Sequence, residues 1–355
     1  MSKKWAVCTA FFILSMPQLS KANEISLEFD SLTYSEPYTI DGLINDLRGD
    51  LSSGNTAFTF NELKLSYQKN NWHIALLSRA DYLLKFNADT AELFYQIENG
   101  VALDTDRKYL IDLQAEHIIA KGVQFGYQWQ FDNDSWLSTD ISLLKASKLM
   151  SGELYGSWQE TSTEQLTDLS LDYHYSKDLL FKSPVSHATG TGIAIDVAGY
   201  WQYDENYSAD FTIKDLFSQI HWSDASYTRV TANSISNVSI VNGQLDVKPI
   251  LSGYTGEERY KQKLPQRWLV GVNYRQRKHS FRSEIFYVSG YVFPRLKYQY
   301  RPTLHVKYST GYDFKSEALS LGLSYYGLDL NLATDSLSKK KAHSLTVTAA
   351  LKLAF

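Results

Sequence analysis

Charged residues at alternate positions are the side chains of this chain best suited to chemistry. Acidic residues dominate the first half and basic residues the second. Because alternate residues of a strand share one face, strands carrying them would place an acidic wall opposite a basic wall around a common interior. A field between such walls orients polar solutes. An alternative is that the charges pair across a filled interior that conducts nothing. The residues expected to line this interior are Asp112, Glu116, Asp140, Asp172, Arg275, Arg282, Arg295, Lys297, Arg301 and Lys307.

Serine beside histidine is the other combination with chemical potential, because a hydroxyl activated by an imidazole and an oriented carboxylate attacks esters. His279-Ser280 and His343-Ser344 are neighbours in sequence, so their side chains would point to opposite faces of a strand. His174 and Asp172 share a face, but no serine motif accompanies them. No spacing of His, Asp and Glu predicts a metal site. We therefore expect no catalytic residue, no cofactor and no enzyme activity.

Period-two alternation along almost the whole chain predicts the elements that carry these side chains. In the run from Val123 to Phe131, apolar residues alternate strictly with Gln and Gly. Similar runs span 62–67, 72–76 and 319–325. Seven prolines among 355 residues suit a chain that is mostly paired in a sheet. The net charge of -4 argues against a nucleic-acid role. The sequence thus predicts an all-β protein.

The last strand, His343 to Phe355, carries the clearest signal about the environment. Leu345, Val347, Leu351 and Phe355 point to one face, and mostly polar residues point to the other. This strand resembles the terminal strand of Gram-negative outer-membrane β-barrels, many of which end in Phe. The resemblance implies a transmembrane antiparallel β-barrel, with Phe355 as part of the signal read by the barrel-assembly machinery. Strands of about 9–11 residues and the usual even count give roughly 18 strands, in a range of about 16–20.

The N-terminal residues predict export. Lys3 and Lys4 precede an apolar run, and Ser20-Lys21-Ala22 fits a cleavage site, so residues 1–22 are expected to be a signal peptide. Cys8 lies inside it, so the mature chain would have no thiol. Residues 23–355 are expected to form a single barrel domain in the cell outer membrane.

The connections predict where helices and turns lie. The segments Asp41 to Gly49 and Asn87 to Gly100 each have a capping residue and a closing Gly, which indicates short loop helices over one rim. Alternatively, one of them folds into the lumen as a constriction. Short turns at Asn70-Asn71 and Lys121-Gly122 suit the periplasmic side. Between Ile213 and Lys248 the alternation falters near Asp215, so a hairpin is missing or merged there.

The charged interior resembles that of general porins and implies a porin-like channel for small polar solutes. Two other interpretations remain: a structural or export-partner barrel without an open pore, and an outer-membrane lipid hydrolase. The expected partners are outer-membrane lipid, lipopolysaccharide and the barrel-assembly machinery. Lys339, Lys340 and Lys341 could meet lipopolysaccharide phosphates, although a simple solvated loop explains them equally. A monomer and a homo-oligomer both remain open.

Overall fold

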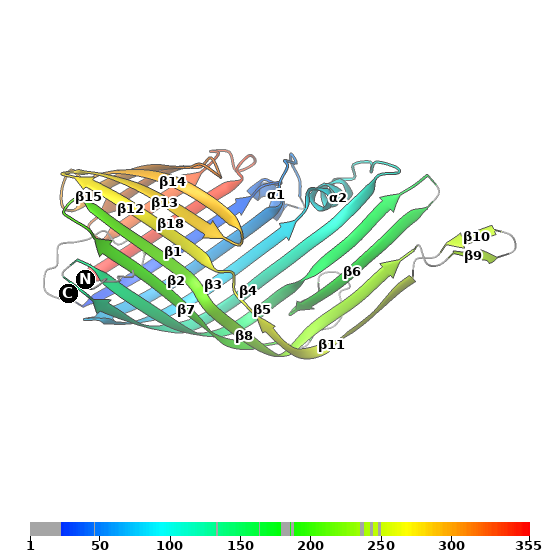
Figure 1. Cartoon of the computed structure of the whole chain (residues 1–355), viewed down its shortest axis with the longest axis horizontal. Coiled ribbons are helices and arrows are strands. Elements are labelled where there is room, and N and C mark those ends of the chain that lie inside the picture. The colour runs from blue at the N-terminus through cyan, green and yellow to red at the C-terminus, as the bar shows by residue number, and fades with distance from the viewer. Residues whose placement is uncertain are drawn as a thin grey trace, which may run out of the picture.

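The structure is a computed structural model, and it describes residues 23–355 except 46, 133, 163, 179–184, 186–187, 235–237, 242–243 and 248–249. The expected signal peptide, with Cys8, lies outside the described residues. Within them, the chain forms eighteen strands and two helices (Figure 1). Neither of these helices is long and apolar enough to cross a bilayer.

Fourteen strands close an antiparallel barrel. The ring closes because β8 pairs with β7 on one side and with β12 on the other, while β1 pairs with β18. In ring order the strands are β12 (Arg267–Gln276), β13 (His279–Val288), β14 (Tyr291–Tyr300), β15 (Val306–Asp313), β16 (Leu319–Tyr325), β17 (Leu328–Thr334), β18 (Ser344–Ala354), β1 (Glu24–Ser35), β2 (Thr56–Lys69), β3 (Trp72–Phe86), β4 (Lys108–Gln130), β5 (Trp136–Glu160), β7 (Gly190–Gln202) and β8 (Tyr207–Asn233).

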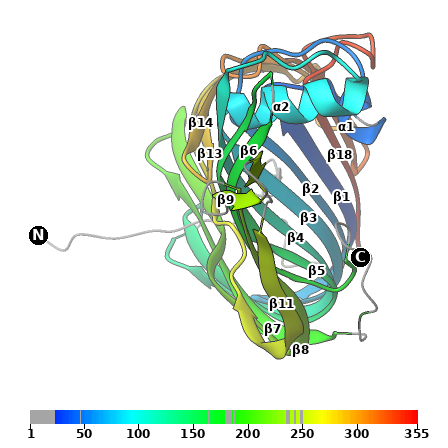
Figure 2. The same ribbon diagram turned by 90° about the vertical axis from the view of Figure 1, so that its right-hand side faces the viewer.

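A second sheet region, which we call the wing, extends from one side of the barrel. It consists of β6 (Gln165–Tyr175), β11 (Ile250–Gln262) and the ends of three long strands, namely 108–116 of β4, 150–160 of β5 and 226–233 of β8. Figure 2, viewed from the wing side, shows β6 and β11 in front of the barrel strands. A separate hairpin, β9 (Val238–Val241) and β10 (Gln244–Val247), lies beyond them. The expected barrel of roughly 18 strands is therefore too large, because four strands lie outside the ring.

The alternation expected from the sequence sorts the side chains of the ring. Leu63, Leu65, Ile74 and Phe125 are exposed on the outside, while their polar neighbours Lys64 and Gln124 are buried inside. The outward face of the terminal strand is likewise apolar and ends at Phe355, whose N–H donates to the Asn23 carbonyl. An apolar exterior around a polar interior suits strands that meet lipid outside.

Two different strands fill the space between β5 and β8 along their length. In the ring, β7 pairs with both of them, and in the wing β6 pairs with both of them. At this junction Ala146, Trp222, Ala225 and Leu264 are buried together in one apolar cluster. These side chains form the apolar packing at the junction between the wing and the ring.

The two helices lie on the rim opposite the chain termini, which we call the helix rim (Figure 1). In α2 (Ala88–Asn99) the Asn87 side chain accepts from the Thr90 N–H, and Gly100 ends the helix at a φ of 63°, as expected. The cap of helix α1 (Ile40–Ile44) lies two residues before the expected one, because Thr39 rather than Asp41 accepts the N-terminal hydrogen bond.

Neither helix is a lumen constriction. Leu93 of α2 packs on Tyr109 and Ile111, which share the outward-facing parity of Phe125 on β4. Leu43 of α1 packs in a cluster with Ala57, which shares the outward-facing parity of Leu63 on β2. Both helices thus support the interpretation of loop helices over a rim.

Two other expectations are corrected by the strand boundaries. Lys121-Gly122 is no turn but lies inside β4. A Cβ on Gly122 would come within 2.4 Å of the Leu143 carbonyl oxygen, so this glycine permits close strand packing. The segment 213–248 holds most of β8 and the β9–β10 hairpin, and the hairpin stands outside the barrel.

Candidate functional site in the barrel lumen

Arg79 on β3 is the centre of the charged interior. Its guanidinium donates two hydrogen bonds of 2.8 Å to the carboxylate of Asp215 on β8. It also donates to Asp81, and Arg267 on β12 donates to Asp215 at 3.1 Å. All four side chains are buried. Because each of these charges is paired with a charge of opposite sign, the group forms a network and not a free charged wall.

A β-bulge in β8 aims Asp215 at these arginines. The β7–β8 register shifts between Ile195 and Val197, and Asp215 adopts a φ of 57°. Its N–H donates to the carboxylate of Asp196 at 2.7 Å. A bulge takes a side chain out of the regular alternation. This is the physical reason why the sequence pattern falters here.

A second charged cluster surrounds Glu284 on β13. Lys297 Nζ and Arg282 Nε each lie 2.6 Å from its carboxylate. Arg282 also donates to Asp210 at 2.7 Å, and Arg295 Nε donates to Asp313 at 2.6 Å. The bases of the second half therefore pair with nearby acids, which differs from the opposed acidic and basic walls expected from the sequence.

Towards the helix rim, the inward positions change from charged to aromatic. On β1 and β2 the opposed pairs run from Glu28–Lys64 and Asp30–Glu62 to Leu32–Phe60 and Tyr34–Phe58. On β13 and β14, Glu284–Arg295 gives way to Phe286–Phe293. We call the resulting buried cluster the aromatic layer; it consists of Tyr34, Phe58, Phe60, Leu83, Phe286, Val288 and Phe293.

The aromatic layer and the charged network both cross the lumen. Strands β1 and β14 are separated by β15 to β18, yet the rings of Tyr34 and Phe293 have centroids 5.0 Å apart. Lys214 on β8 reaches Glu62 on β2 at 2.9 Å. Side chains fill a barrel of about 8 strands, and the diameter grows with strand number. A circular lumen of 14 strands would be too wide for these contacts, so the barrel is flattened where they occur.

A cavity of about 180 Å³, which we call the lumen cavity, lies beside these contacts. Leu32, Phe60, Leu269 and Phe286 give it an apolar side. Lys352 points its ammonium into the buried interior and finds no hydrogen-bond partner among the described residues. The cavity is thus amphipathic. Its charged lining residues are Glu28, Asp30, Glu62, Asp329, Lys214, Arg267, Arg295 and Lys352.

The structure divides the expected pore-lining residues between the lumen and other places. Arg282, Arg295 and Lys297 belong to the Glu284 cluster, and Lys307 lies 3.7 Å from Asp329. Asp140 is also buried, with His73 Nε2 at 2.6 Å from its carboxylate.

The remaining expected residues lie elsewhere. Asp112, Glu116 and Asp172 occupy the wing, where Glu116 accepts from Ser151 and Asp172 accepts from Arg229. Arg275 is near the end of β12, and Arg301 follows the end of β14, both on the side of the chain termini. Of these five residues, Glu116 lines a small pocket together with Phe60 and Asp81, and Arg301 interacts electrostatically with Asp329, which lines the lumen cavity.

The central lumen residues that sequence reasoning left out of the site are Asp215, Arg267, Lys214 and the rings of the aromatic layer. The faltering alternation at Asp215 was the available signal for a bulge. For the aromatic layer, the signal was Phe58 and Phe60 at inward parity, on the same strand as Glu62 and Lys64.

Among the serine and histidine candidates, His174 lies on the wing and is paired with a carboxylate. His174 Nε2 lies 2.7 Å from Glu258, while the Ser151 hydroxyl opposite it is within 2.7 Å of Glu116 and Tyr260 oxygens. Both residues are on the wing's inner face and not on the apolar exterior. Among the described residues, no group of three or more His, Cys, Asp or Glu could hold a metal ion.

No family model matches the chain, and no match was found among curated proteins. Similar solved structures include the toluene transporter TbuX of Ralstonia pickettii (11% identity, TM-score 0.47, 95% of this chain and 90% of that chain). They also include the toluene transporter TodX of Pseudomonas putida (10% identity, TM-score 0.46, 95% and 90%). A FadL homologue of Pseudomonas aeruginosa is 8% identical, with a TM-score of 0.40 and coverage of 94% and 87%. At these identities the likeness concerns the fold alone.

The closed ring, apolar exterior and polar interior define the fold class as an antiparallel β-barrel of the outer-membrane type. This class was expected from the terminal strand, and it is confirmed.

Proposed function

We propose that the barrel is an outer-membrane channel for small amphipathic molecules, meaning molecules with an apolar body and a polar or charged head. The observation that carries this proposal is the lumen cavity, which has rings and aliphatic side chains on one side and charges of both signs on the other. A pocket with an apolar lining and a few polar groups binds a matching ligand. The sequence predicted a channel for small polar solutes, and we now restrict the proposed solutes to those that also have an apolar part.

The aromatic layer is proposed to exclude solutes that carry no apolar part. Its side chains meet across the lumen, so a solute must displace ring contacts and replace them with its own. A wholly polar solute would lose hydration there without gaining contacts. An amphipathic solute regains contact area at the rings.

Selectivity by charge is proposed for the lysines and arginines that line or flank the cavity. Arg295 lines it, and Lys297 and Arg282 flank it through Glu284. The wider set proposed from the sequence, including Asp112, Glu116, Asp140, Asp172, Arg275, Arg301 and Lys307, remains part of this hypothesis as residues along the solute path. Reversing the charge of Arg295 should change the ratio of cation to anion flux.

Uptake into proteoliposomes tests the proposal with two amino acids that share one zwitterionic head. L-Phenylalanine carries an aromatic body and L-serine does not. We expect phenylalanine to enter faster than serine relative to protein-free vesicles, although it is larger. Phe286→Ala should reduce this preference, and the matched control Tyr308→Ala, on the barrel exterior, should not.

Faster entry of serine would indicate an ordinary size-selective pore and contradict the proposal. Entry of neither solute would favour the structural or export-partner barrel.

A further inference from the structure

The inner face of the wing is a polar and aromatic surface that lies outside the closed ring. It continues the inward parity of the barrel, and none of the residues in its three central rows has an aliphatic side chain. From β4 across β5, β6 and β8 to β11, these rows are Glu116–Ser151–His174–Tyr227–Gly256, Gln114–Glu153–Asp172–Arg229–Tyr254 and Asp112–Tyr155–Ser170–Thr231–Ser252.

A chain of side-chain contacts holds this face in one arrangement. The Ser151 hydroxyl is 2.6 Å from Glu116 and 2.7 Å from the Tyr260 hydroxyl. The Tyr260 ring stacks on His174 with centroids 3.8 Å apart, and His174 meets Glu258. Because these side chains are already ordered, the protein loses less side-chain entropy when a ligand binds.

The same face keeps acceptors available. Glu153 and Asp172 are directly opposite each other on β5 and β6, and like charges in that position destabilise a sheet. Arg229 satisfies one oxygen of Asp172 and the other is buried, so the exposed Glu153 is the carboxylate that a ligand can reach. A ligand that donates hydrogen bonds to Glu153 would reduce its repulsion from Asp172.

A pocket of about 510 Å³ lies over this face. Glu153, Asp172, His174 and Tyr260 line its wing side, and the linker 263–265 lines its barrel side. Next to it in the rows are Tyr155 and Tyr254, which are 52% and 59% exposed. Exposed tyrosine rings offer flat apolar surfaces with a polar edge.

We propose that the wing's inner face binds a soluble, neutral oligosaccharide. Sugar hydroxyls would donate to Glu153, and the C–H face of a sugar ring would stack on Tyr155. An apolar ligand does not fit the wing side of the pocket, because its rows carry no aliphatic side chain. An anionic ligand is disfavoured because three carboxylates, Glu116, Glu153 and Asp172, line the pocket with two lysines, Lys85 and Lys263. A membrane-held glycan would approach the outer apolar face of the strands, whereas this face is turned to the barrel interior.

An array of soluble neutral oligosaccharides, probed with the full mature chain in detergent, tests this proposal. The best binder is then titrated calorimetrically against variants. We expect Tyr155→Ala and Glu153→Gln each to weaken binding about tenfold, equivalent to about 1.4 kcal/mol. Tyr308→Ala, which removes an equally exposed tyrosine from the barrel exterior, should bind like the wild type.

Glu153→Gln also separates binding from folding, because it removes a like-charge contact and should not weaken the sheet. The proposal is overturned if no array sugar binds the wild type, or if both variants bind unchanged. Binding only to vesicles that contain lipopolysaccharide would overturn the soluble ligand. None of these results depends on whether the barrel conducts.

Discussion

Asp215 is the carboxylate that links charged side chains of several strands in the lumen. It is fully buried and holds Arg79 and Arg267 on two other strands. The sequence predicted which charges point inward, because alternation within a strand is local. It could not predict the pairing, because partners such as Arg79 and Asp215 are far apart in the chain and meet only when the ring closes and flattens.

Asp215→Asn should destabilise the barrel strongly. The change leaves two buried guanidinium groups with too little negative charge, and removing one partner of a buried pair costs about 3–5 kcal/mol. Urea unfolding from lipid vesicles, followed by tryptophan fluorescence, measures the loss. Asp112→Asn, at an exposed wing position, is the control and should change little. Equal stability of the two variants would show that the network is not a structural element.

The lowered pKa of Glu258 leads us to expect that strand β11 of the wing is less stable in acid. Strand β11 lies outside the ring, and hydrogen bonds from Arg229, and then from His174, hold the pKa of Glu258 below its usual range. A carboxylate with a lowered folded-state pKa stabilises above its unfolded pKa, about 4.3, and this contribution is lost as the pH falls through the lower folded-state value.

Hydrogen exchange of β11 amides, compared at neutral and acid pH, measures this effect. We expect protection to fall in acid for the wild type, and to change less with pH in Glu258→Gln. The same acid response in both proteins would contradict the role of this carboxylate.

At the scale of elements, local signals were reliable and long-range ones were not. The Asn87 cap and the Gly100 stop predicted α2 correctly, since both act within one helical turn. The turn predicted at Lys121-Gly122 was wrong, because the sequence alone does not distinguish a glycine in a turn from a glycine that permits close strand packing. The aromatic layer was missed although Phe58 and Phe60 obey the parity of β2, because rings at inward positions look like an error in the pattern.

The caps of α2 can be tested separately from the barrel. Asn87→Ala removes the side chain that accepts from the Thr90 N–H, and losing such a cap costs about 1 kcal/mol. Because α2 packs on the exterior at the rim, we expect faster hydrogen exchange in α2 and unchanged exchange in the ring strands. A loss of protection throughout the barrel would show that α2 supports the ring.

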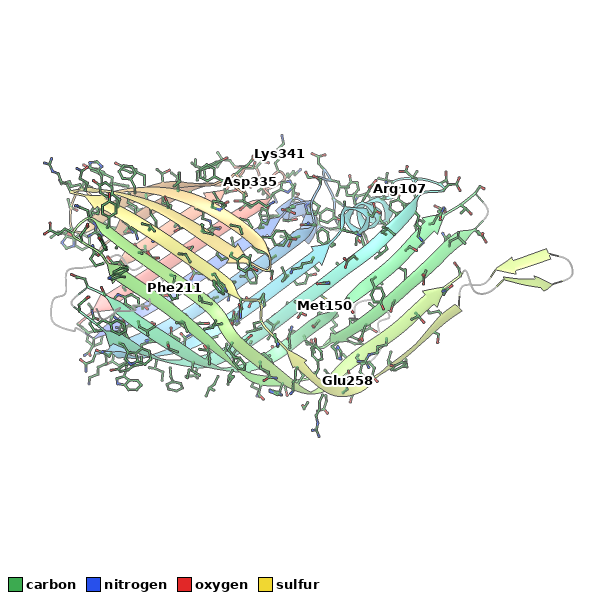
Figure 3. The ribbon with its side chains drawn as sticks, in the orientation of Figure 1. Arg107, Met150, Phe211, Glu258, Asp335 and Lys341 are labelled. Atoms are coloured by element: carbon green, nitrogen blue, oxygen red, sulfur yellow. The ribbon has the colours of Figure 1, made fainter. Side chains whose placement is uncertain are left out.

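The helix rim brings loops from both halves of the chain together, as Figure 3 shows for Arg107, Asp335 and Lys341. Lys339 Nζ is 3.6 Å from Asp41 on this rim. Arg107 donates to Asp89 and Glu92 of α2, and these hydrogen bonds raise its pKa above the ordinary range. Contact of Lys339, Lys340 and Lys341 with lipopolysaccharide remains a proposal.

At the scale of the whole molecule, the sequence predicted a barrel but not its size. Alternation counts strands, and it does not say which strands are neighbours. Strands β6 and β11 alternate like barrel strands, yet they extend the sheet beside the ring. The lengths of β4, β5 and β8, which are 23, 25 and 27 residues, were the signal that strands run past the ring. In the sequence, the alternation of one long strand can be mistaken for two shorter strands joined by a turn, so the lengths were not recognised.

The most direct test of the closed lumen is ion conductance in planar bilayers. The wild type is compared with a double variant, Phe58→Ala with Phe293→Ala, which removes the contact between these rings in the aromatic layer. We predict a small conductance for the wild type and a conductance several-fold larger for the variant. A wild-type conductance as large as that of the variant would contradict a lumen closed by side chains that meet across it.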